Sequence, residues 1–371
     1  MKTKKIYLAL ALVSFVTWSC TTQNDLTSSS LKTSINANAQ NLITAVNTIS
    51  ASPGYQLLAS QSQASQSGSQ GMMMAKQSVA AFDSTYSQIL LSDLAGVWDY
   101  KAALYMHHDP NLLKFFQKTG TSADMVVKLP ESKVKRFWDL LHYAPADTAL
   151  VNNYVVDVSK YAYHFNHFLG WDYDMASNIA ISNVSAGDLA IQSSNSRAKG
   201  YHFTSSFAFA DGYKASTSYT SGDTIISVYG ISKAGATLYE EKYTAIRTST
   251  TSRHREKEYS LTIGNVQIVR SAGKNSLDSA KVFVNGVLQL HSVVKIVTDS
   301  TATVANNDES TVTNHNRTIQ ITFDDGTSTT IKALLGSTID NIQTLFTTLR
   351  QAYFSTNVVD WIAWDIYKNK P

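Results

Sequence analysis

The chain of 371 residues has only one cysteine, five prolines and 17 glycines, and only 16% of its residues are charged. A single cysteine excludes a disulfide bond within the chain. The low glycine and proline content, with aromatic residues at 11%, excludes a collagen-like chain and a long disordered one. The formal net charge of +3 argues against a nucleic-acid partner, which favours a far more basic surface.

The N-terminus has the features of a secretory signal peptide, which we assign to residues 1–19. Three lysines precede the apolar run 6–16, which as a helix would span roughly 16 Å, too short for a bilayer core of about 30 Å. No other stretch approaches 18 apolar residues, so no transmembrane helix is predicted. Residues 20–371 hold 28 basic and 28 acidic side chains, so the positive balance belongs to the signal and indicates no acidic partner.

The only cysteine, Cys20, follows this segment directly and resembles the lipobox cysteine of bacterial lipoproteins, whose thiol is acylated. Ser19 fits that pattern, whereas Thr17 stands in place of leucine and Trp18 is bulky. The relaxed lipobox and the Ser/Thr/Asn-rich segment after it are similar to lipoproteins of the Bacteroidota. The resemblance implies a membrane partner through acylated Cys20 and a place at the outer membrane of the cell envelope, on its periplasmic face or at the cell surface. An ordinary signal peptide that leaves a free cysteine is the alternative.

Composition divides the rest of the chain into a tether and a domain. Residues 20–80 are predicted to be a lipidated tether that contains a short helix, 33–50, and a low-complexity linker, 59–71. Residues 81–371 are predicted to form a single domain. The chain has 45 serines and 37 threonines, and many alternate with apolar residues from about residue 150 onward, which predicts an antiparallel sheet with one wet face.

The expected fold class is α+β: a curved antiparallel sheet, half-barrel or meander, packed with a few helices that include an N-terminal helix and a C-terminal amphipathic helix. Hydrophobic periodicity and turn residues set the expected elements. Strands are predicted at 86–91, 94–101, 125–129, 201–209, 213–219, 224–231, 236–247, 257–270, 280–285, 287–297, 317–323 and 327–334. Helices are predicted at 33–50, at 109–120, from 130 onward and from 337 onward, with 358–367 a short helix or strand.

Aromatic and histidine side chains supply the candidate ligand-binding residues. The segment Leu94–Tyr100 (LAGVWDY) resembles the opening strand of lipocalin-like domains and of many Bacteroidota lipoproteins, and it contributes Trp98. The segment 163–174 (YHFNHFLGWDYD) is the densest group of such side chains. Its candidates are Tyr163, His164, His167 and Trp171.

A metal site depends on the local structure of this second segment. On a helix, His164 and His167 would share a face and could bind a metal ion, whereas on a strand they would point to opposite faces. Tyr161, Tyr163 and Phe165 alternate with other residues, which favours a strand. We therefore assign no metal site and expect either an aromatic-rich structural segment or a binding lip.

No catalytic motif is present in the sequence: it has no G-x-S-x-G, P-loop, G-x-G-x-x-G or H-E-x-x-H pattern. No catalytic residue and no cofactor are assigned. The expected function is that of a non-catalytic binding or accessory lipoprotein of the cell envelope, with an apolar or glycan ligand. The alternatives are a structural or interaction lipoprotein without a small ligand, and a hydrolase. The oligomeric state is left open.

Five aspartate–hydroxyl pairs, each followed by a small, apolar or threonine residue, are similar to the O-glycosylation sites of Bacteroidota proteins. The hydroxyl-bearing residues are Ser84, Thr148, Thr224, Ser279 and Ser300. The resemblance implies that the protein carries O-linked glycans, which would make its mass exceed that of the acylated polypeptide alone.

Overall fold

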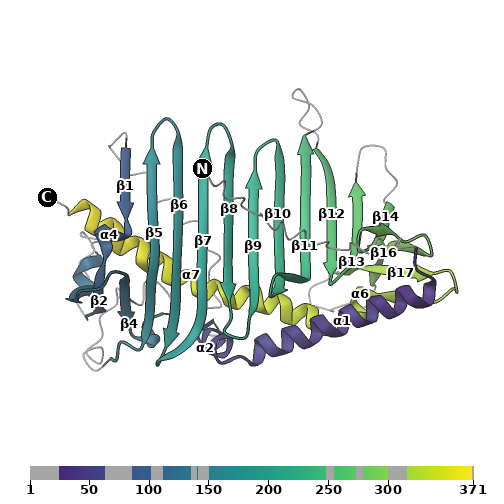
Figure 1. The fold of residues 1–371 in the computed structure, drawn as a ribbon, viewed down its shortest axis with the longest axis horizontal. Helices are drawn as coiled ribbons and strands as arrows, with labels where there is room; N and C mark the ends of the chain where they lie inside the picture. The colour runs from purple at the N-terminus through teal and green to yellow at the C-terminus, as the bar shows by residue number, and fades with distance from the viewer. Residues whose placement is uncertain are drawn as a thin grey trace, which may run out of the picture.

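The computed structural model describes residues 25–62, 86–101, 112–134, 140, 150–247, 255–272, 279–299 and 316–369. These form a mixed α+β fold in which a large, curved, unclosed antiparallel sheet packs against an N-terminal and a C-terminal helix (Figure 1). The predicted fold class is confirmed. Among the described residues, no helix combines the length and the apolar character needed to cross a membrane.

The elements have the following bounds. The strands are β1 (Tyr86–Leu90), β2 (Gly96–Tyr100), β3 (Phe116–Gly120), β4 (Met125–Leu129), β5 (Tyr154–Asn166), β6 (Gly170–Ile181), β7 (Val184–Ser196), β8 (Gly200–Ala208), β9 (Tyr213–Ser221), β10 (Thr224–Lys233), β11 (Ala236–Arg247), β12 (Arg255–Ile263), β13 (Val266–Ala272), β14 (Ser279–Val284), β15 (Val287–Leu288), β16 (Ser292–Asp299), β17 (Asn316–Phe323) and β18 (Ser328–Thr330). The helices are α1 (Ser28–Ala51), α2 (Pro53–Ser62), α4 (Leu91–Leu94), α6 (Ile331–Leu335) and α7 (Thr338–Lys368), with short 3₁₀ turns η2 (Leu112–Phe115) and η3 (Glu131–Lys133).

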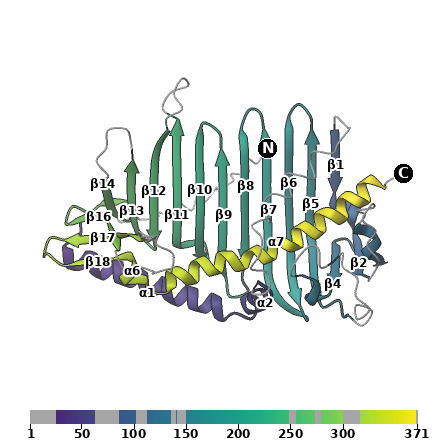
Figure 2. The ribbon, with the colours of Figure 1, turned by 180° about the vertical axis from the view of Figure 1, so that it is seen from behind.

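The strands from β5 to β14 form an antiparallel meander in which each strand pairs with the next. Along its other edge β5 pairs with β1 and with β4, and β4 runs parallel to β2. At the opposite end β14 pairs with β16, which continues to β17 and β18. β1 and β18 stand at opposite ends of the sheet in Figure 2, so the sheet does not close.

Side chains alternate between two unlike faces of the sheet, as expected for period-two strands. On β6, Met175, Ile179 and Ile181 are buried against the helices, while Asp172 and Asn178 point the other way. We call these the helix-side face and the polar face. Serine, threonine and charged residues populate the polar face, which confirms the predicted wet face.

Helix α1 belongs to the same hydrophobic core as the sheet, although its residues lie within the predicted tether 20–80. It packs on β11, β12 and β13 through one apolar stripe. The stripe is formed by Leu31, Ile35, Leu42, Val46 and Ile49. The turn between β12 and β13 also contacts α1, because Asn38 Nδ2 donates to Asn265 Oδ1 at 2.7 Å and a Cβ at Gly264 would overlap the Asn38 side chain.

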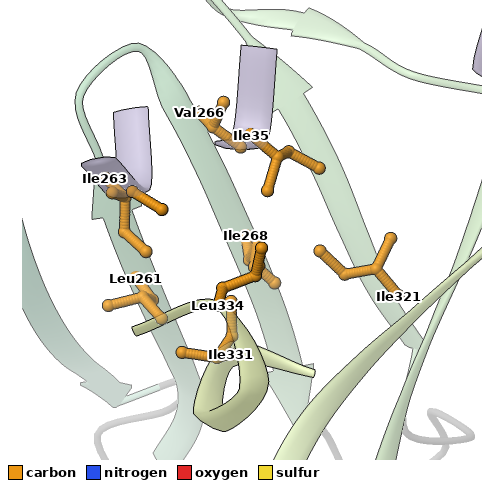
Figure 3. Close-up of a pocket in the computed structure, with 9 residues that line it drawn as sticks. Ile35, Leu261, Ile263, Val266, Ile268, Ile321, Ile331 and Leu334 are labelled. Carbon is orange, nitrogen blue, oxygen red and sulfur yellow. The ribbon is translucent and has the colours of Figure 1, made fainter. Parts of the chain in front are cut away.

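The space between α1, the sheet and α6 holds an apolar cavity of about 10 Å³, which has room for no more than about one water molecule (Figure 3). Ile35 of α1, Leu261 and Ile263 of β12, and Ile331 of α6 point toward one another around it. Since its walls are apolar, this space is a packed core rather than a site for an apolar ligand.

Polar contacts join the residues at the start of α1 to the loop before β16. His291 Nδ1 lies 2.5 Å from Asp324 Oδ2, and His291 Nε2 lies 3.5 Å from Asp25 Oδ2. The Leu290 amide donates to Asp25 Oδ1 at 3.0 Å. The hydrogen bond to Asp324 and the charge of Asp25 raise the pKa of His291 above its usual value. His291 therefore joins two acidic groups most strongly when it is protonated.

This contact should depend on pH. Because the pKa of His291 is raised in the folded protein, its stabilisation is present below the ordinary histidine pKa and is lost as the pH rises through the raised value. We expect His291→Gln to lower the melting temperature more at pH 5.5 than at pH 8.5, at low salt. His202→Gln is the matched control, since His202 is also exposed but contacts Thr220 instead of a carboxylate. An equal effect of His291→Gln at both pH values would contradict the expectation.

Helix α7 crosses the helix-side face diagonally (Figure 2). Phe346 packs on Tyr229 of β10, with ring centroids 5.8 Å apart, and Tyr353 Oη donates to Ser205 Oγ of β8 at 2.6 Å. Seven residues further, Asp360 accepts from Tyr173 of β6. Seven helical residues advance about 10.5 Å and two strands span about 9.6 Å, so a seven-residue repeat on α7 meets every second strand.

The structure corrects several of the predicted elements. The strand at 257–270 is two strands joined by a turn at Gly264, whose φ is +60°. The strand at 327–334 is β18 followed by α6, and 116–120 is β3 rather than the end of a helix. The segment 287–297 contains β15 and β16, separated by residues outside any strand.

The helices differ from the prediction at their ends. Helix α2 continues to Ser62 and so includes the first residues of the linker predicted at 59–71, whose other residues lie outside the described ones. Among the described residues between 130 and 150, only η3 and Leu140 are helical, and most of the helix predicted from 130 onward lies outside the described residues. Ser337 precedes α7 but its side chain makes no capping hydrogen bond, and 358–367 is part of α7 rather than a separate element.

Candidate ligand-binding face

The structure separates the five predicted ligand-binding residues. Tyr163 and Trp171 lie on the helix-side face, on paired strands β5 and β6. His164 lies on the polar face, and His167 lies in the hairpin between these strands. Of the predicted group, only Tyr163 and Trp171 therefore share a surface with each other.

His164 has a partner at each ring nitrogen. Its Nδ1 lies 2.7 Å from Asp172 Oδ2 on the neighbouring strand, and its Nε2 lies 3.1 Å from Gln88 Nε2 of β1. His167 packs its ring against Phe168, with centroids 5.3 Å apart. The described part of the chain contains no group of three or more His, Cys, Asp or Glu placed to hold a metal ion.

Trp98 lies far from the other candidates. Its Nε1 donates to Leu94 O at 2.9 Å, and Lys118 Nζ lies 5.4 Å from its ring centroid. Trp98 is opposite Val127, which is opposite Val156 on β5, whereas Trp171 is opposite Phe165. The nine residues between these two points on β5 span roughly 30 Å, so Trp98 belongs to a different part of the sheet.

An aromatic row that was not predicted from the sequence crosses eight strands on the helix-side face. The pairing registers place its members at one level, each directly across from the next strand. The row consists of Tyr163, Tyr173, Phe203, Tyr219, Tyr243 and Tyr259 on β5, β6, β8, β9, β11 and β12, with Ser193 and Ser227 on β7 and β10. Each strand contributes one ring or one hydroxyl, so the row can be recognised only when the pairing register of the strands is known.

Helix α7 covers the β5 end of the aromatic row, whereas rings nearer its centre are exposed. Tyr163 is only 6% exposed, whereas Tyr219 and Tyr243 are 36% and 37% exposed. Trp171 joins the exposed rings through Tyr201: the ring centroids of Trp171 and Tyr201 are 6.1 Å apart, and those of Tyr201 and Tyr219 are 6.0 Å apart. The exposed rings of Tyr219 and Tyr243, with the half-buried Ser227 between them, thus form a surface that combines flat apolar faces with hydrogen-bonding groups, whereas Ser193 is buried.

A carboxylate lies beside the covered end. Tyr161 and Tyr173 each donate from Oη to Asp360 Oδ1 at 3.0 Å. Burial raises the pKa of Asp360 to about 7, against the lowering effect of these hydrogen bonds. The Trp364 ring packs edge-on against Tyr163, with centroids 5.3 Å apart. We call Tyr161, Tyr163, Tyr173, Asp360 and Trp364 the carboxylate–tyrosine cluster.

The predicted modification sites are only partly within the described residues. Thr224 begins β10 and is half-buried, next to an exposed Asp223, and Ser279 begins β14. Ser84, Thr148, Ser300 and the predicted lipidation site Cys20 lie outside the described residues.

Comparisons with protein families, with curated proteins and with solved structures found no match to this chain.

Proposed function

We propose that the protein is a lipid-anchored, non-catalytic binding protein of the cell envelope whose ligand is a glycan bound along the aromatic row. The observation that carries this proposal is the alignment of six aromatic rings and two serines across eight consecutive strands, with its central rings exposed. A sugar ring has an apolar face of C–H groups and a rim of hydroxyls, so rings that alternate with hydroxyls match both of its surfaces.

Between the two ligand classes expected from the sequence, the structure favours the glycan. The apolar cavity beside α1 is too small for an apolar ligand. The exposed rings, in contrast, are tyrosines that keep a hydroxyl at their tip. A ligand with both apolar and polar surfaces therefore fits this row better than a purely apolar one.

We expect the double substitution Tyr219→Ala with Tyr243→Ala to weaken glycan binding roughly 30-fold, since each aromatic contact contributes about 1 kcal/mol. Binding is measured by an oligosaccharide array, then by calorimetry on the oligosaccharide bound best. Tyr86→Ala is the matched control, because Tyr86 is 55% exposed but lies on β1, on the polar face. Equal losses in the control and the double variant would contradict the proposal. An array on which no oligosaccharide binds would favour a structural or interaction lipoprotein instead.

A further inference from the structure

Asp360 has an oxygen without a partner in the carboxylate–tyrosine cluster. Both tyrosine hydroxyls bind the same atom, Oδ1, which leaves Oδ2 without a hydrogen bond. Among the described residues, no lysine, arginine or histidine contacts Asp360. A carboxylate that is partly removed from water is costly unless a cation or further donors accompany it.

A second polar group in the cluster also has no hydrogen-bond partner among the described residues. This group is the buried Tyr163 hydroxyl. Burial, and then the charge of Asp360, raise the pKa of Tyr163 above its usual value. Trp364 lies one helical turn after Asp360 on α7 and packs on the Tyr163 ring, which places the two groups in one cluster. A buried hydroxyl without a partner is energetically costly, so the pair has an unmet hydrogen-bonding capacity.

Aromatic rings surround these two acceptors. The rings of Tyr161 and Tyr173 meet edge-to-face at 5.6 Å, and Trp364 contacts both Tyr163 and Tyr367. The faces of such rings attract cations. An ammonium group carries three N–H donors and a positive charge, which match a carboxylate oxygen, a free hydroxyl and aromatic faces at once.

We infer that the carboxylate–tyrosine cluster binds the primary ammonium group of a ligand, and that the glycan of the aromatic row is an amine-bearing one. This inference rests on the proposed function, because Tyr173 belongs to both the row and the cluster. A sugar stacked on the row near Tyr173 would place an amino substituent toward Asp360. Asp360 and Tyr173 are both half-buried as whole residues, and Asp360 Oδ2 is not one of the fully buried oxygens without a partner.

The test compares two ligands that differ in whether their amino groups are free or acetylated, and therefore in charge. Glucosamine hexamer and N-acetylglucosamine hexamer are titrated at neutral pH into the full-length protein in detergent, and into two variants. Asp360→Asn keeps an oxygen that accepts from Tyr161 and Tyr173 but removes the charge. Tyr163→Phe removes only the hydroxyl without a partner, so it preserves the fold if the first variant does not. Circular dichroism and thermal melting check the fold of each variant.

We expect the wild-type protein to bind the amine-bearing hexamer at least tenfold more tightly than the acetylated one. Asp360→Asn should abolish this preference, and Tyr163→Phe should reduce it severalfold. Equal binding of both hexamers by the wild type would overturn the inference and leave the proposed function standing. A preference that survives both substitutions would overturn it as well. Failure of both hexamers, together with a blank oligosaccharide array, would overturn the proposed function and the inference together.

Discussion

Replacement of Leu42 by alanine is expected to lower the free energy of unfolding by about 2–5 kcal/mol. Leu42 has no exposed surface and lies in the middle of the apolar stripe of α1. Its truncation removes buried methyl groups and leaves a cavity in the layer that joins the helices to the sheet. Urea unfolding of the two proteins under the same conditions measures the difference.

Gln40→Ala is the control for this prediction. Gln40 is on the same helix, two residues away, and is exposed, so its substitution should change stability by no more than about 0.5 kcal/mol. If Leu42→Ala lowered the free energy of unfolding as little as Gln40→Ala, α1 would not be part of the cooperative core. The helix would then act as the sequence alone suggests, as a segment of the tether.

The second large effect concerns membrane attachment. We expect Cys20→Ala to move the protein from the membrane fraction to the soluble fraction almost completely, because each acyl CH₂ in the bilayer contributes about 0.8 kcal/mol and the described helices offer no span in its place. Fractionation of cells, with and without globomycin, measures the distribution and the processing of the signal peptide.

The neighbouring substitution Asn24→Ala is the control for Cys20→Ala, since it changes the same segment and leaves the thiol in place. The control should stay in the membrane fraction and be processed normally. Retention of Cys20→Ala in the membrane, or processing that does not respond to globomycin, would refute lipidation at this cysteine.

The sequence predicts strands β8 to β11 well because their two faces differ strongly in polarity, whereas no bounds were predicted for β5, β6 and β7. In β8, for example, Tyr201, Phe203 and Phe207 alternate with polar or small residues. The hairpin at Asn285 and Gly286 was also predictable, since both residues adopt positive φ there. The turn at Gly264 was missed because apolar residues alternate on both sides of it without a break in composition.

The aromatic row could not be predicted, because its successive rings are 10 to 30 residues apart in the sequence and only the strand register brings them together. The sequence indicated the role of Asp360 only weakly. Phe346 and Tyr353 precede it at intervals of seven residues, so a carboxylate occupies the next position of an aromatic repeat. A charged residue on the packed stripe of a helix indicates a partner on the surface beneath it, here Tyr161 and Tyr173.

The contact of Asp25 with the loop before β16 limits how far the protein can reach from a lipid on Cys20. The five residue steps from Cys20 to Asp25 span at most about 18 Å when fully extended. The start of α1 lies at the β17 end of the sheet (Figure 1), and β5 is roughly 43 Å from β14 across nine strand spacings. With an acylated Cys20, every part of the aromatic row would stay within roughly 60 Å of the anchoring lipid. The protein would therefore sample only ligands held in a thin layer at the membrane, where their local concentration is set by the envelope rather than by the surrounding medium.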